Sequence, residues 1–138
     1  MKLSPGSTVQ LHQAFRCCPY AGMVLGQLHD WCEQNGLSVV AQGAGVQLVH
    51  SCGSDASQAQ LTWDALAELK GHEGPVLVTG CLARIDPGGV ASALSGFSES
   101  AGLGPKQLER LDELLTEPKR SWDQVQPSGE SRYTGTEM

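Results

Sequence analysis

The sequence contains no apolar run long enough to cross a membrane. A spanning helix needs about 20 consecutive apolar residues, and no stretch of the 138 residues approaches that length, although 40% of them are hydrophobic. The first residues, Met1 to Gly6, are too polar for a secretion signal. We therefore expect a soluble, cytoplasmic protein that forms one globular domain and has no membrane partner.

Basic residues are also scarce in this chain. Nine Lys and Arg stand against 15 Asp and Glu, which gives a formal net charge of −6. Affinity for nucleic acid depends mainly on Lys and Arg that neutralise phosphates. No direct nucleic-acid binding is therefore expected, and an RNA partner would have to be bound by another domain or protein.

Two frequent signatures of enzymes are missing as well. No pair of carboxylates occurs in a motif for acid–base catalysis. The glycine-rich turn at residues 42–45 precedes a predicted strand and does not open a helix, so it is not a phosphate-binding loop. The sequence thus offers no residue with an assigned catalytic role.

Cysteine occurs five times, an odd number, and without a secretion signal. A framework of disulfides is not expected in a reducing cytosol. Packing, redox chemistry and metal binding are the roles that remain for these cysteines.

Strand and helix patterns alternate along the first 117 residues. Alternating or continuous apolar residues predict strands, and apolar residues spaced three and four apart predict helices. The predicted strands are 8–15, 37–41, 46–50 and 75–79, and the predicted helices are 23–35, about 55–70, 90–94 and an amphipathic one after Pro105. This order predicts an α/β fold, a small open parallel sheet with helices on both faces, like half of a flavodoxin or Rossmann domain. The pattern weakens after residue 86, and a Gly/Ser-rich stretch follows residue 94. We expect residues 1–117 to form the domain and the polar residues 118–138 to be a disordered tail or linker.

Three of the cysteines occupy equivalent positions in this pattern. Cys18, Cys52 and Cys81 each follow a predicted strand and precede a predicted helix. The carboxyl ends of parallel strands meet at one edge of a sheet, where such folds bind ligands. Spacings of 34 and 29 residues are too long for a local metal-binding knuckle, so the fold would have to bring the sulfurs together. A thiolate at a helix N-terminus is also expected to have a lowered pKa.

The residues alone leave the chemistry of this edge open. Three converging thiolates favour a soft metal centre, either a [4Fe–4S] cluster with one open iron or zinc with a fourth ligand. Without a metal, the same thiols would suit a sulfurtransferase that carries persulfide, or would be buried without a reaction. His50, two residues before Cys52, is an alternate fourth ligand or proton donor, although packing at the strand end is the favoured interpretation. Cys32, four residues after Leu28 on an apolar helix face, is interpreted as a small core residue.

Segments around these cysteines resemble a known family. Residues 76–84 (VLVTGCLAR) are similar to a segment VVTGCxAQ, and residues 46–52 (VQLVHSC) to an apolar strand that ends in NTC. Cys18 is followed eighteen residues later by Gly36, which is similar to the family's first cysteine, its helix and the glycine that ends the helix. The leucine-rich stretch from Gly102 to Leu115 looks like a closing segment. The family is that of the radical-SAM methylthiotransferases, and the resemblance covers about residues 8–116, its N-terminal auxiliary cluster-binding domain.

The resemblance implies that Cys18, Cys52 and Cys81 bind an auxiliary [4Fe–4S] cluster. In that family, the open iron of the cluster is associated with the sulfur that is inserted into a tRNA base or a ribosomal protein. Cys17 is an alternate first ligand, but adjacent residues on a strand point to opposite sides. The spacing to Gly36 favours Cys18.

The chain also departs from the family pattern. The Asn, Asp and Glu of the family's CxxNxxDSE are missing after Cys18, and His50 and Ser51 replace an Asn-Thr pair. No CxxxCxxC motif occurs, so the chain lacks the radical-SAM cluster itself. We therefore expect an accessory protein or detached domain, a methylthiotransferase-like transferase component, acting with a radical-SAM protein or a missing C-terminal catalytic domain. A persulfide carrier and a zinc-binding interaction module are the alternatives.

Overall fold

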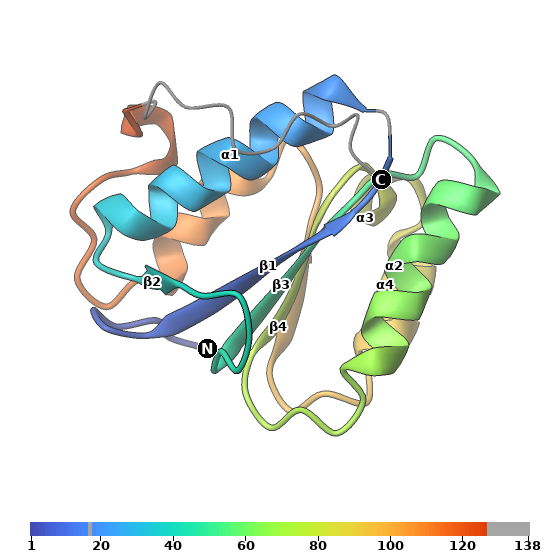
Figure 1. The fold of residues 1–138 in the computed structure, drawn as a ribbon, viewed down its shortest axis with the longest axis horizontal. Helices are drawn as coiled ribbons and strands as arrows, with labels where there is room; N and C mark the ends of the chain where they lie inside the picture. The colour runs from blue at the N-terminus through green and yellow to red at the C-terminus, as the bar shows by residue number, and fades with distance from the viewer. Residues whose placement is uncertain (17, 127–138) are drawn as a thin grey trace.

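A computed structural model describes residues 1–16 and 18–126 of the chain. Within these residues, five strands form one parallel sheet in the order β2-β1-β3-β4-β5 (Figure 1). The strands are β1 (Thr8–Ala14), β2 (Ser38–Val39), β3 (Val46–Ser51), β4 (Val76–Gly80) and β5 (Ser100–Leu103). This is the strand order of flavodoxin-like folds, and it confirms the predicted α/β class.

Helices cover both faces of the sheet (Figure 1). The helices are α1 (Pro19–Gln34), α2 (Ala56–Glu68), α3 (Cys81–Ile85), α4 (Pro87–Leu94) and two 3₁₀ helices, η1 (Leu108–Leu114) and η2 (Trp122–Gln124). One core cluster joins α1 and η1 to the sheet, and a second joins α2 and α4 to its opposite face. The molecule is therefore a three-layer sandwich with a core on each side of the sheet.

The two central strands, β3 and β4, are buried along their whole length. Leu48 and Leu77 pack in the cluster on the α1 side, whereas Val49 and Val78 pack in the cluster on the α2 side. This double burial explains the nearly continuous apolar sequence of these strands, which is typical of parallel sheets.

The structure contains a strand in the Gly/Ser-rich stretch after α4, to which the sequence pattern assigned no element. Residues 100–103 form the edge strand β5, although their sequence, Ser-Ala-Gly-Leu, carries no strand pattern. Gly102 lets the strand pack closely against α4, because a Cβ at this position would lie 3.0 Å from Val90 Cγ1. The predicted amphipathic helix after Pro105 is the 3₁₀ helix η1, and it buries Leu108 and Leu111 as that pattern requires.

The predicted disordered tail at 118–138 is wrong for residues 118–126. Trp122 is 9% exposed, and its backbone N–H donates to the Asp112 carboxylate at 3.0 Å. Asn35, at the end of α1, accepts the backbone N–H groups of Lys119 and Arg120 at 2.8 and 2.9 Å. One buried aromatic and a few backbone hydrogen bonds thus fasten a polar segment to α1, which composition alone does not reveal. Residues 127–138 lie outside the described part of the chain.

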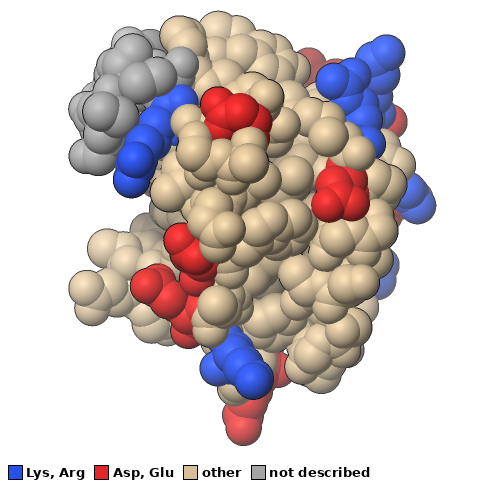
Figure 2. All heavy atoms as spheres, turned by 90° about the vertical axis from the view of Figure 1, so that its right-hand side faces the viewer, with Lys and Arg blue, Asp and Glu red and all other residues tan. Residues whose placement is uncertain are grey.

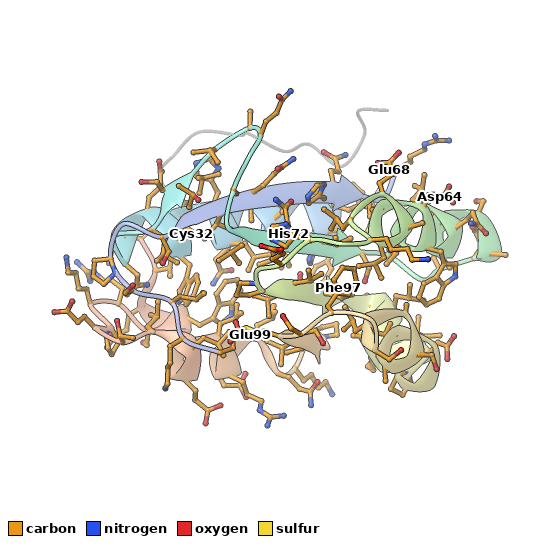
Figure 3. The ribbon with its side chains drawn as sticks, turned by 90° about the horizontal axis from the view of Figure 1, so that it is seen from below. Cys32, Asp64, Glu68, His72, Phe97 and Glu99 are labelled. Carbon is orange, nitrogen blue, oxygen red and sulfur yellow. The ribbon has the colours of Figure 1, made fainter. Side chains whose placement is uncertain are left out.

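A second hollow, separate from the cysteines, lies between α2 and α4. About 700 Å³ of space, including its open mouth, is lined mainly by apolar residues, among them Trp63, Leu66 and Phe97. Phe97 is labelled in Figure 3. Figure 2 shows this side of the molecule, where charged side chains are isolated and most of the surface is uncharged. In the described residues, no helix has the length and apolarity to cross a bilayer.

Candidate metal centre

The register of the sheet brings two of the three predicted cysteines to one level. Ala14 of β1, Ser51 of β3 and Gly80 of β4 are direct partners across the sheet, and adjacent strands lie about 4.8 Å apart. Cys52 and Cys81 are the residues directly after Ser51 and Gly80 in the sequence. Between β1 and β3 the strand order reverses, and this switch point is where open α/β sheets bind ligands.

All three predicted cysteines line one pocket at this edge. Its walls are built from the start of α1, the ends of β3 and β4 and the segment before η1, and it contains about 290 Å³ of space free of protein atoms, open mouth included. The lining residues are Cys18, Tyr20, Ala21, Val24, His50, Ser51, Cys52, Gly80, Cys81, Pro105 and Leu108. Sulfurs that are far apart in the sequence are thus gathered at one place by the fold.

Cys18 is the N-cap of α1 and is half-buried. Its Sγ accepts the backbone N–H of Ala21 at 3.4 Å, and Pro19 occupies the first helical position, where its missing N–H costs nothing. The sulfur therefore lies at the positive end of the dipole of a 16-residue helix.

Cys52 is buried just beyond the end of β3. Its thiol donates to Ser54 Oγ at 3.5 Å. At the next residue, Gly53, a Cβ would lie 3.1 Å from side-chain carbons of both Leu82 and Ile85 in α3. The absence of a side chain at Gly53 lets the loop after β3 pack against α3, which brings Cys52 close to Cys81.

Gly80 and Ser51 fix the turn that presents Cys81. Gly80 has a φ of 101°, and a Cβ there would collide with the Ser51 carbonyl oxygen. The Ser51 hydroxyl donates to the Thr79 carbonyl at 2.7 Å and accepts the Leu82 backbone N–H at 3.3 Å. Ser51 therefore ties the end of β3 to both sides of the junction between β4 and α3.

The pKa of Cys81 is raised, not lowered as expected from its place at a helix start. Burial is the largest cause, and the neighbouring Cys52 and Cys18 add to it, while Arg84 acts in the opposite direction. Because α3 has only five residues, its dipole is too short to outweigh these effects. Cys52 and Cys18 are thus close enough to Cys81 to disfavour its thiolate.

His50 is packed at the strand end, as the favoured interpretation predicted. Its side chain is 2% exposed, its Nδ1 lies 2.7 Å from Thr79 Oγ1, and its ring meets Phe15 edge-on with the centroids 5.7 Å apart. Burial lowers the pKa of His50 to about 4. The ring is therefore neutral near neutral pH.

Cys32 does not belong to the pocket. Cys32 is buried in the core on the inner face of α1 (Figure 3), as predicted, and burial followed by the charge of Glu33 raises its pKa to about 12. Cys17, the alternate first ligand, lies outside the described residues.

The cysteine thiols of the pocket are donors that suit a soft metal. In residues 1–16 and 18–126, no group of three or more His, Cys, Asp or Glu side chains has a ready-made arrangement for one metal ion. Tetrahedral zinc with Zn–S distances of 2.3 Å requires sulfurs about 3.8 Å apart. A [4Fe–4S] cluster binds each thiolate at a different iron, so it accepts thiolates that are more widely spaced. The pocket is small and largely apolar, and its lining supplies three thiols, which is the number of thiolates that a cluster with one open iron requires.

Sequence patterns did not indicate the residues that organise the pocket. Ser51, Gly53 and Thr79 act through hydrogen bonds and close contacts between neighbouring strands, which depend on register. The one signal for them was their position directly beside the cysteines. Comparison of the chain with protein-family models, with curated proteins and with solved structures gave no match.

Proposed function

We propose that Cys18, Cys52 and Cys81 bind a [4Fe–4S] cluster with one open iron. The main support is that three cysteines from three separate strand–helix junctions line one pocket at the ligand-binding edge of the sheet. Three protein ligands leave the fourth iron without a side chain from this set.

The electrostatics of the pocket favour a metal centre over free thiolates. Burial and the nearness of Cys52 and Cys18 disfavour the thiolate of Cys81. A bound cation removes this penalty because it neutralises the three sulfurs together. A persulfide carrier needs a thiolate without that help, so it remains the second candidate.

We further propose that the chain acts as an accessory or detached domain in sulfur insertion, beside a radical-SAM partner. The resemblance of residues 76–84 and 46–52 to methylthiotransferases supports this role, and the missing CxxxCxxC motif calls for a partner. When bound, the cluster would supply an iron at which a sulfur ligand can attach. The chain itself would hold the cluster through three thiolates and shield it with the apolar walls of the pocket.

Exposed apolar side chains beside the pocket support a protein partner. Within the described residues, large apolar side chains are exposed at Tyr20, Met23 and Ile85, with 55%, 70% and 55% of their surface accessible. Tyr20 lines the pocket, Met23 follows it on α1, and Ile85 lies against Gly53 next to Cys52. Apolar side chains gathered around a site are typical of a docking surface.

Anaerobic reconstitution of the full chain with iron and sulfide tests the cluster. We expect about four irons and four sulfides per chain, with the broad visible absorption of an iron–sulfur cluster. Cys18→Ala, Cys52→Ala and Cys81→Ala should each lose most of this iron, whereas Cys32→Ala, in the core, should retain it. Wild-type protein without iron, or three ligand variants that load like wild type, would refute the proposal.

The same preparations separate the two alternatives. A persulfide carrier would gain one sulfur on a single cysteine in metal-free protein, detected by mass spectrometry. A zinc module would bind one zinc ion per chain tightly enough to prevent iron loading. Either result in place of a four-iron cluster would assign the pocket differently.

A further inference from the structure

The wall of the cysteine pocket contains a buried histidine paired with a threonine. His50 of β3 lies on the same face of the sheet as Cys52, two residues later, and it lines the pocket. Its register partner on β4 is Thr79, and Thr79 Oγ1 lies 2.7 Å from His50 Nδ1.

This pairing determines which ring nitrogen of His50 carries the proton. Thr79 is completely buried, and in the described part of the chain its hydroxyl has no hydrogen-bond partner other than His50 Nδ1. If Nδ1 carried the proton, it would donate to Thr79, and the hydroxyl hydrogen would be left buried without an acceptor, which is unfavourable. In the other tautomer the hydroxyl donates to Nδ1, both groups are satisfied, and the proton is on Nε2.

Among the described residues, Nε2 of His50 then has no hydrogen-bond partner. Thr62 Oγ1 is the only side-chain nitrogen or oxygen in the described residues that is both buried from solvent and without a partner, so Nε2 keeps some access to solvent. Because His50 is one of the residues that line the pocket, we infer that this access is through the pocket. The lining contains no carboxylate, and the hydroxyl of Ser51 already donates to a carbonyl and accepts an N–H. Apart from the hydroxyl of Tyr20, a residue that is 55% exposed, the side-chain acceptors that remain in the lining are the three cysteine sulfurs.

We propose that His50 presents a neutral Nε2–H group to anionic sulfur in the cysteine pocket, and that Thr79 fixes this tautomer. The position of the proton on Nε2 follows from the contact between His50 and Thr79 and does not require a cluster. The further statement that the acceptor is a thiolate or sulfide of a cluster rests on the proposed function. His50 is consequently a positioning residue and not a fourth metal ligand, because a ligand would need the lone pair of Nε2. Hydrogen bonds to cluster sulfurs stabilise added negative charge and raise the reduction potential.

The tautomer is tested on metal-free, reduced protein by long-range ¹H–¹⁵N correlation spectra of the histidine rings. His50→Gln identifies the His50 signals among the four histidines. We expect a protonated Nε2 and an unprotonated Nδ1 in wild type and in Thr79→Ser, and loss of this preference in Thr79→Val. A wild-type ring protonated on Nδ1 would overturn the proposal, whether or not a cluster binds.

The donor role is tested by the reduction potential of the reconstituted protein. His50→Leu, which has no donor, should have a lower potential than wild type with the same iron content, and His50→Gln, which retains an N–H group, should recover part of the difference. An unchanged potential in His50→Leu, or loss of an iron ligand in that variant, would refute the donor role while leaving the cluster itself established. If wild-type protein binds no cluster, the proposed function fails and the ring spectra alone decide the inference.

Discussion

At the scale of single residues, the position of Cys81 depends on a neighbour that has no side chain. Gly80 ends β4 with a φ of 101°, a conformation that other residues rarely adopt. The space that a Cβ would need is filled by the backbone of Ser51. Backbone atoms cannot move aside as a flexible side chain can. The positive φ and the lack of space for a Cβ therefore both require glycine at the residue before Cys81.

Gly80→Ala should therefore disrupt both stability and the site. We expect a loss of about 1–3 kcal/mol from the positive φ alone, together with weaker iron loading, because the turn that presents Cys81 must shift. The control is Gly88→Ala in α4, where a Cβ meets no atom within 4 Å and the φ is not positive. Urea unfolding should show Gly88→Ala equal to wild type or slightly more stable. Equal stability of the two variants would contradict the assignment.

His50 should make the metal-free protein sensitive to moderate acid. Burial lowers its pKa in the folded state to about 4, from an unfolded value of 6.5, so the unfolded chain takes up the proton first. Stability is therefore complete above about pH 6.5 and falls as the pH decreases toward about 4, with a slope that approaches about 1.4 kcal/mol per pH unit. Urea unfolding at about pH 7.5 and about pH 5 measures this loss. His50→Gln should show a smaller loss, and an equal loss would exclude His50 as its source.

At the scale of elements, the segment from 118 to 126 belongs to the packing of α1. Asn35 joins them: its Nδ2 donates to the Trp31 and Arg120 carbonyls at 2.9 Å, and its Oδ1 accepts two backbone N–H groups of the segment. Gln34 also accepts the backbone N–H of Gln126 at 3.0 Å. The last turn of α1 therefore holds the segment mainly through its backbone.

Asn35→Ala should release this segment. Loss of these hydrogen bonds leaves buried polar groups unpaired, and we expect destabilisation by about 2 kcal/mol or more. Hydrogen exchange at residues 119–126 should become faster in the variant. Lys119→Ala is the matched control, because the hydrogen bond to Asn35 uses the Lys119 backbone N–H and survives the substitution. Unchanged exchange in Asn35→Ala would show that other contacts hold the segment.

The elements differ in how far the sequence predicted them, for physical reasons. β3 and β4 were predictable because burial on both faces requires a continuous apolar run. β5 was not, because an edge strand of four residues with one glycine is selected by contact with α4 and not by propensity. The three cysteines were predictable from their places after strands, whereas the pairing of His50 with Thr79 depends on register, which one sequence does not specify.

At the scale of the whole molecule, two hydrophobic cores support the sheet independently of any metal. One core lies under α1 and η1, and the other under α2 and α4. Small domains whose core is a metal site are unfolded without it, but here the pocket is at the edge of a sheet that already has both faces covered.

The metal-free protein should therefore be folded. We expect native far- and near-UV circular dichroism after treatment with a chelator under reducing conditions, with cooperative unfolding in urea. Simultaneous Cys18→Ala, Cys52→Ala and Cys81→Ala substitution should leave the cooperative transition in place. A metal-free chain without a cooperative transition would show that the centre, and not the two cores, organises the fold.

The pairing of Ala14, Ser51 and Gly80 across the sheet determines when the three cysteines come together during synthesis. The third sulfur joins the other two only when β4 has inserted beside β3, which requires the chain through residue 81. A nascent chain that has emerged only through β3 offers two of the three thiols and no closed pocket. Under the proposed function, assembly machinery that delivers a cluster would therefore meet all three cysteines only after residue 81 has been synthesised and β4 has paired with β3, so cluster insertion would follow folding of this edge.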